Sequence, residues 1–90
     1  MMKFDRMSLL TGKNNYRRWA GSWQIAFDSL GLWEIITGES PEPPSSQEND
    51  HKIWKAANKH LRAVLLNAVD EDLQSFVIDN PTPKYAWEAL

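Results

Sequence analysis

Hydrophobic side chains recur at a helical period in two long stretches of the chain. The first stretch follows the turn-rich segment 11–15, where Asn14 or Asn15 can cap a helix that begins near Tyr16. Its apolar positions are three and four residues apart, so they form one stripe along a helix, and Gly31 can end that helix. The stripe consists of Tyr16, Trp19, Ala20, Trp23, Phe27 and Leu30.

The second long stretch has the same period and predicts a helix of about fifteen or more residues. Asn49 or Asp50 precedes it and can serve as its N-cap. Its apolar positions are Ile53, Trp54, Ala57, Leu61, Val64, Leu65 and Ala68.

Three shorter patterns predict three short helices. One covers residues 32–37 and ends at Gly38, and another covers residues 73–78 between the acids 70–72 and the breaker Asp79-Asn80-Pro81. The third begins with Thr82 as N-cap and Pro83 in the first turn. These five patterns predict that residues 1–90 form one all-α domain, a bundle of about five helices. No stop signal follows Leu90, so we also expect the sequence to be a fragment of a longer protein.

The segment between the two long patterns has a different composition. Residues 39–50 contain three prolines, four acidic residues and no apolar side chain apart from those prolines. Such a composition cannot bury enough surface to order the chain. We therefore expect an acidic, proline-rich, mobile loop.

Large side chains dominate the predicted core. The chain has five tryptophans, and each is in phase with the apolar stripe of its helix, so core packing is a better interpretation than a ligand cage. The predicted core residues are Tyr16, Trp19, Trp23, Phe27, Leu30, Trp33, Trp54, Leu61, Leu65 and Trp87.

Residues for catalysis or metal binding are scarce. The chain has no cysteine, and its two histidines, His51 and His60, are nine residues apart, too far along a helix to share a metal. Gly12 begins no phosphate-binding motif, and the acids 70–72 are typical of an exposed helix start. The sequence predicts no enzyme, cofactor, metal or small-molecule substrate, and no apolar run is long enough to cross a membrane.

Charge is unevenly distributed although the net charge is only −2. Residues 1–33 carry five basic and two acidic side chains, residues 34–50 carry five acids and no base, and residues 51–90 carry five of each. One side of the second long helix forms a basic stripe. It is either a solvated face balanced by the acidic segments or a contact for an acidic partner or RNA. The stripe is Lys52, Lys55, Lys59 and Arg62.

The first long helix has an apolar residue on its polar side. Ile25 lies about 180° from Tyr16 around the helix. A lone exposed apolar residue is ordinary, but Gly21 and Ser22 beside it would let another helix approach closely. We therefore predict a self-assembly face made of Arg18, Gly21, Ser22, Ile25 and Ser29.

Several of these positions together resemble a known family. Segment 10–19 is similar to the Leu-x-Gly-x-Asn-Tyr-x-x-Trp opening of copia-type LTR retrotransposon Gag proteins, with one extra asparagine. The resemblance continues in the same order over nearly the whole chain. The further matching positions are Leu30, segment 32–38, Pro41, Pro43, Trp54, Ala57, Ala86, Trp87 and Leu90.

The resemblance implies a capsid N-terminal-domain-like helical bundle. It would self-assemble with other Gag copies into a virus-like particle around retrotransposon RNA in the cytoplasm. The resemblance implies at most weak or indirect RNA contact by this region, because no Cys-rich zinc knuckle is present. The alternative is a domesticated Gag-derived module that binds a peptide or protein partner. A helix-turn-helix DNA binder is a third interpretation, against which the negative net charge counts.

Overall fold

The computed structural model describes residues 8–90, and these residues contain five α-helices and no β-strand, which confirms the expected all-α fold. Two helices are long and three are short, as the apolar pattern predicted. A short 3₁₀ helix, Glu71–Leu73, precedes the fourth. The α-helices are α1 (Lys13–Ser29), α2 (Trp33–Thr37), α3 (Glu48–Asn67), α4 (Gln74–Ile78) and α5 (Pro83–Ala89).

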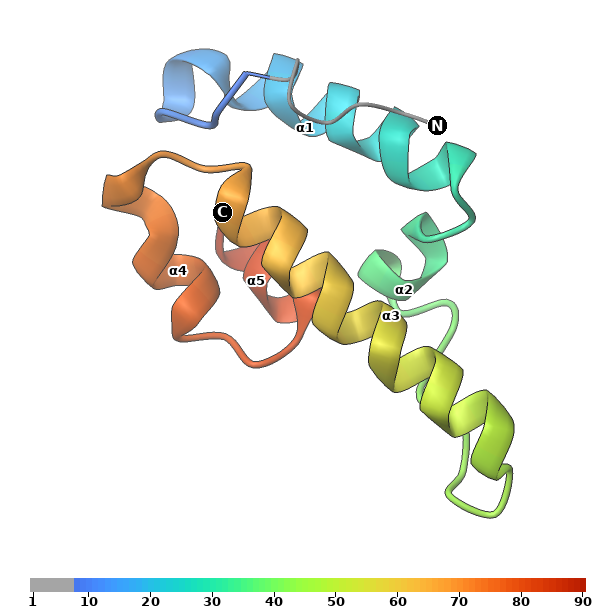
Figure 1. Cartoon of the computed structure of the whole chain (residues 1–90). Coiled ribbons are helices and arrows are strands. Elements are labelled where there is room, and N and C mark those ends of the chain that lie inside the picture. The colour runs from blue at the N-terminus through green and yellow to red at the C-terminus, as the bar shows by residue number, and fades with distance from the viewer. Residues whose placement is uncertain (1–7) are drawn as a thin grey trace.

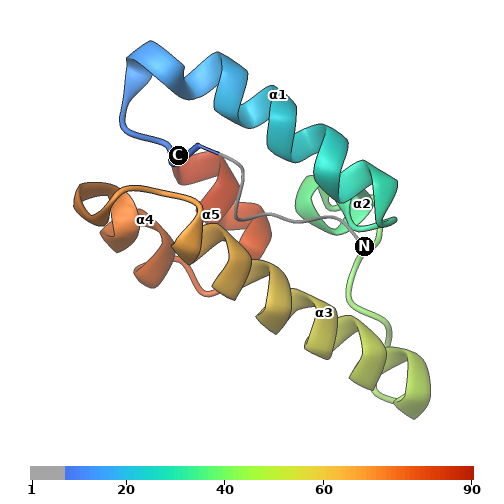
Figure 2. The same cartoon turned by 45° about the horizontal axis from the view of Figure 1, so that its top comes forward.

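Helix α5 is at the centre of the arrangement. It packs against α2, α3 and α4, and α1 closes over the assembly from one side (Figures 1 and 2). The ring of Trp87 on α5 stacks on Trp19 of α1 with centroids 5.2 Å apart, and it meets Trp33 edge-on at 5.4 Å. A helix of seven residues therefore connects all the others.

Helix α1 begins earlier than predicted. Its first residue is Lys13, with Gly12 at the N-cap, so neither Asn14 nor Asn15 caps it. The Asn15 side chain instead reaches back: its Oδ1 accepts from the Thr11 backbone N–H at 3.0 Å, and its Nδ2 donates to the Leu9 carbonyl at 2.7 Å. Asn15 thus fastens the preceding segment to the first turn of the helix.

The end of α1 is the glycine-dependent turn that the sequence predicted. Gly31 has a φ of 71°, a region that side chains with a Cβ rarely adopt. The Leu32 N–H donates to the Phe27 carbonyl at 2.9 Å and the Gly31 N–H donates to the Asp28 carbonyl at 3.1 Å, the two bonds of a Schellman motif. This turn redirects the chain into α2.

Helix α3 also begins earlier than predicted, at Glu48, with Gln47 at the N-cap and no side-chain cap. Asn49 and Asp50 are therefore inside the helix, where the acids Glu48 and Asp50 favour the positive end of its dipole. The expected loop 39–50 shortens to a linker of residues 39–47.

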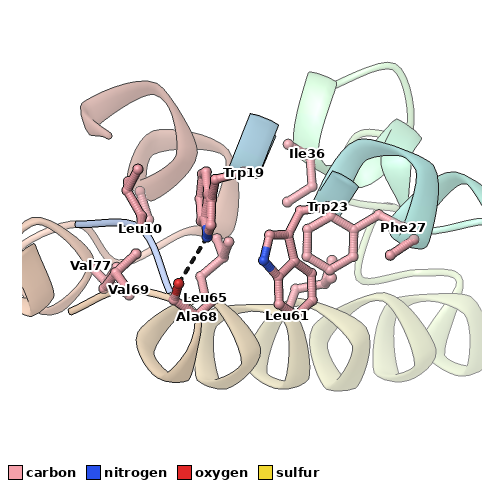
Figure 3. Packing of buried hydrophobic residues seen from close by; sticks show 12 residues of the cluster. Leu10, Trp19, Trp23, Phe27, Ile36, Leu61, Leu65, Ala68, Val69 and Val77 are labelled. Atoms are coloured by element: carbon pink, nitrogen blue, oxygen red, sulfur yellow. Dashed lines mark hydrogen bonds between the residues drawn. The ribbon is translucent and has the colours of Figure 1, made fainter. Parts of the chain in front are cut away.

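Among residues 8–90, twelve buried hydrophobic residues form the core, and all five α-helices contribute to it together with Leu10, Ala68 and Val69 (Figure 3). Five predicted core residues are in it, and the half-buried Trp33 and Trp87 pack against it. Trp54 was wrongly placed in the core: it is half-buried outside this cluster, where its indole Nε1 donates to the Ser40 carbonyl at 3.0 Å. Tyr16, 37% exposed, and Leu30, 49% exposed, were wrongly placed in the core. Tyr16 lies at the edge of the apolar stripe. Leu30 is the C-cap of α1, where the backbone is no longer helical, so its side chain does not continue the stripe. The five confirmed residues are Trp19, Trp23, Phe27, Leu61 and Leu65.

The segment before α1 pairs with the end of α3. Leu10 and Val69 form a parallel β-bridge, in which the Leu10 N–H donates to the Ala68 carbonyl at 3.0 Å and the Asp70 N–H donates to the Leu10 carbonyl at 2.8 Å. The Ala68 carbonyl also accepts from the Trp19 indole Nε1 at 2.8 Å (Figure 3). One carbonyl at the C-cap of α3 therefore anchors both the N-terminal segment and α1.

Thr82 caps α5 as predicted: its Oγ1 accepts from the Tyr85 backbone N–H at 3.2 Å. We expect Thr82→Ala to lower the free energy of unfolding by about 1 kcal/mol, because that N–H loses its partner. The thermal midpoint should fall by about 4–8 °C. Thr82→Ser keeps the hydroxyl and should melt within a few degrees of wild type. An alanine variant that melts like wild type would mean that this cap contributes nothing.

Candidate assembly surfaces

The predicted self-assembly face is on the outer side of α1, by which we mean the exposed side that does not carry the buried Trp19, Trp23 and Phe27. All five of its residues, Arg18, Gly21, Ser22, Ile25 and Ser29, are exposed. Ile25 is 71% exposed, more than any other large hydrophobic residue described as exposed. The geometry therefore brings these residues to one open surface, with a large apolar side chain among small and polar neighbours.

Gly21 has no role inside the protein that would require a glycine. It lies within α1, and a Cβ built at this position meets no atom within 4 Å. A glycine in a helix interior costs about 1 kcal/mol relative to alanine. The domain therefore carries a local destabilisation that its own packing does not explain.

The predicted basic stripe divides into two parts. Lys52, Lys55 and Lys59 are exposed, but Arg62 is only partly exposed. Arg62 Nε donates to the Asn80 carbonyl at 3.1 Å and Nη2 donates to the Ile78 carbonyl at 2.8 Å. This side chain therefore ties α3 to the end of α4, a structural role that the sequence did not indicate.

The acidic segments do not neutralise the three lysines by direct pairing. Within residues 8–90, no carboxylate lies within 4.0 Å of Lys52, Lys55 or Lys59 Nζ. The recorded pair is Glu42 Oε2 with His51 Nε2 at 2.6 Å, which joins the linker to the first turns of α3. The lysine charges are therefore available to a partner.

An apolar groove adjoins this stripe, and the sequence analysis did not find it. It has a volume of about 510 Å³ and lies between the C-terminal half of α3 and the end of α4. Ile78, 59% exposed, is in its wall, and Lys59 and Arg62 supply its charge. The apolar pattern of residues 73–78 predicted a helix but could not say which of its side chains α3 leaves uncovered. The remaining lining residues are Asn58, Ala63, Leu66, Val77 and Pro81.

A second apolar groove, of about 390 Å³, lies where the segment before α1 meets α4 and the end of α5. Tyr16, 37% exposed, and Phe76, 44% exposed, are on its surface, and Lys13 is the charged residue in its lining. Tyr16 therefore belongs to a surface groove and not to the core. The other lining residues are Leu10, Gly12, Leu73, Ala89 and Leu90.

The histidines and acids of the described residues do not gather into a metal-binding cluster. Residues 8–90 hold no group of three or more histidines and acids that could bind a metal ion. His51 pairs with Glu42, and His60 is on the exposed side of α3. Across the same residues, none of the helices has the length and apolarity needed to cross a membrane.

The comparisons with known proteins add no relative. No protein-family model, curated protein or solved structure matches this chain. We therefore infer a function from two exposed surfaces of this helical domain. They are the outer side of α1 and the groove beside α4.

Proposed function

We propose that the chain is a structural domain of a copia-type Gag protein, without catalytic activity, that self-assembles through the outer side of α1. The particle would form in the cytoplasm around retrotransposon RNA. The observation that carries the proposal is the pairing of Ile25, 71% exposed, with a helix-interior glycine whose Cβ position is open. Such a surface lets a second helix approach closely and bury an apolar side chain.

The family resemblance supports the proposal because its residues have clear physical tasks in this fold. Leu10, Asn15 and Trp19 fasten the N-terminal segment to the ends of α1 and α3. Trp87 joins α5 to α1 and α2 through ring contacts. The resembling positions therefore account for a particular helical architecture, which is what a capsid domain requires.

Weak contacts suffice for this function. A face of five residues on one helix cannot give a tight dimer, but a closed shell repeats each contact many times by symmetry. The lysines facing solvent on α3 can add a non-specific attraction to RNA phosphates without base recognition. Assembly would therefore respond sharply to small changes at the α1 face.

Gly21→Ala separates assembly from folding. The new methyl group meets open space inside the protein, so we expect the free energy of unfolding to rise by up to about 1 kcal/mol. The same methyl group would hold a neighbouring helix away, so particle formation by the full-length protein should fall strongly. Ile25→Asp should leave the melting temperature nearly unchanged and abolish particles.

The measurements are thermal melting of the chain, together with size-exclusion chromatography and electron microscopy of the full-length protein. Gln24→Ala, an exposed change on α1 outside the proposed face, is the matched control and should assemble normally. Particles of normal yield from both Gly21→Ala and Ile25→Asp would show that the α1 face is not the assembly surface.

A domesticated module that binds a protein partner is the second candidate function. The observation that favours it is the pair of apolar grooves, which take no part in the contact through the α1 face. The two candidates differ in the product expected from the full-length protein: a large homogeneous particle for a Gag, and a complex of small, fixed stoichiometry for a binding module.

A further inference from the structure

We infer that the groove between α3 and α4 receives the acidic, proline-rich linker of a second copy of this chain. The basic groove is defined here as Lys55, Lys59, Arg62, Ala63, Leu66 and Ile78, and the acidic linker as residues 39–47. The inference rests on the proposed self-assembly and adds a second, head-to-tail contact to it. The α1 face alone would join copies through like surfaces.

The basic groove combines two chemistries that an acidic proline-rich segment satisfies together. Ala63, Leu66 and Ile78 give an apolar surface, and Ile78 is 59% exposed. Lys59 lines the same groove, and Lys55 lies one helical turn away on the same side of α3. Neither lysine has a carboxylate within 4.0 Å among residues 8–90. The groove therefore favours an occupant with both apolar surface and negative charge.

Arg62 gives the groove a fixed shape. Its two hydrogen bonds to the Asn80 and Ile78 carbonyls hold the end of α4 at a set distance from α3. The guanidinium keeps its positive charge while its donors are used in this way. The groove is therefore formed before anything binds, which lowers the entropic cost of binding.

The acidic linker has the complementary composition. Glu39 and Glu42 are exposed, and residues 34–50 contain no basic side chain. Pro41 and Pro44 are exposed as well, and their rings supply apolar surface on a backbone whose φ angles are already restricted. Each copy of the chain thus carries both members of a charged and apolar pair.

The linker of the same chain is held outside the groove. Glu42 is held at His51, and the Trp54 indole Nε1 donates to the Ser40 carbonyl at 3.0 Å. The lining of the groove begins at Asn58, about 10 Å further along α3 than His51 at ~1.5 Å per residue. Figure 1 shows the linker at one end of the molecule and α4 toward the other. Surfaces at opposite ends join neighbouring copies head to tail, a contact that extends into rings or filaments.

A peptide titration tests the groove without requiring assembly. The ¹⁵N-labelled chain is titrated with a synthetic peptide of residues 38–50, at low salt and at a chain concentration where it is monomeric. We expect saturable shifts of the backbone amides of Lys59, Ala63, Leu66 and Ile78. A peptide with Glu39 and Glu42 both changed to Gln should bind roughly five- to tenfold more weakly, because two surface ion pairs are lost.

Two variants of the chain complete this test. Lys55→Gln combined with Lys59→Gln should weaken peptide binding by the same factor, whereas Lys84→Gln, on α5 outside the groove, should not change it. Absence of shifts in the basic groove, or equal binding by the Glu and Gln peptides, overturns the inference. Displacement of the peptide by an RNA oligonucleotide that shifts the same amides more strongly would also overturn it, since the groove would then be a phosphate site.

The full-length protein distinguishes this inference from the proposed function. Neutralising either surface, with Lys55→Gln and Lys59→Gln or with Glu39→Gln and Glu42→Gln, should block extended assembly. In a mixture of the two variants, the intact linker of one variant can bind the intact groove of the other, and the α1 faces are unchanged. The mixture should therefore give larger species than either variant alone. Normal particles from both variants overturn the inference and leave the proposed function standing. If the wild-type protein binds the peptide in the groove but forms no particles, the proposed function is overturned and the groove contact stands.

Discussion

Trp23→Ala is expected to remove most of the stability of this domain. Trp23 is 3% exposed and its ring lies 5.3 Å from that of Phe27, in the layer between α1 and α3 (Figure 3). Truncating a buried tryptophan costs about 3–5 kcal/mol, through lost burial and the cavity that remains. A small domain has about 5–15 kcal/mol in total. A large fraction of the variant should therefore be unfolded at 37 °C.

Chemical and thermal unfolding, followed by far-ultraviolet circular dichroism, measure this effect. The thermal midpoint should fall by at least about 12 °C, at about 4 °C or more for each kcal/mol in a chain of this length. Ile25→Ala is the control on the same helix: its side chain is 71% exposed, so the change should stay within about 0.5 kcal/mol. Near-native melting of Trp23→Ala would contradict the burial of this residue.

Trp19→Ala should be comparably damaging, for a partly different reason. The indole is 3% exposed, stacks on Trp87, and donates to the Ala68 carbonyl at 2.8 Å. Its removal leaves a cavity between α1 and α5 and also deletes a bond that joins α1 to the end of α3. We expect a loss of about 3–5 kcal/mol. Hydrogen exchange should also be faster at the Leu10 and Asp70 amides, because the Trp19 ring no longer shields the β-bridge of Leu10 and Val69 from solvent.

Tyr16→Ala is the informative comparison for Trp19. Tyr16 is one turn earlier on the same apolar stripe, but it is 37% exposed and faces the second groove. Its truncation should cost clearly less than that of Trp19, by at least about 1–2 kcal/mol. Equal losses for the two variants would mean that Tyr16 is buried in solution, as the sequence pattern alone suggests.

These stability tests and the assembly tests concern different residues of the same helix. The side of α1 that carries Trp19, Trp23 and Phe27 holds the fold together, and the opposite side carries Gly21 and Ile25. Core substitutions should therefore abolish assembly only by unfolding the domain. Surface substitutions should abolish it in a protein that melts normally, which is why melting must accompany every particle assay.

The family resemblance and the structure bear on different questions. The resembling residues lie largely in the core, at turns and at helix ends, so they favour an architecture and name no chemistry. Gly21 and Ile25, which carry the proposed function, are not among the resembling positions. The assembly face therefore has to be tested in this protein itself.

Local signals in the sequence determined the helices and several of their ends. Apolar residues at intervals of three and four residues predicted both long helices, because only one side of each can be buried. Gly31 and Thr82 predicted their turns correctly, since a left-handed φ and a side-chain acceptor are properties of single residues. The exposure of Ile25 also followed from its angle around one helix.

Contacts between distant segments could be decided only by the tertiary structure. Leu10 is buried because it pairs with Val69, and Arg62 is fixed by carbonyls of residues 78 and 80. The starts of α1 and α3 were misjudged because Asn15 bonds backward and because α3 begins without a side-chain cap. Helical periodicity fixes the angle of a side chain around its own helix. Whether that side chain is buried depends on which other helix packs against it, and no local sequence pattern encodes this packing. The same reason explains why the basic groove, made jointly by α3 and α4, had no signal in the sequence.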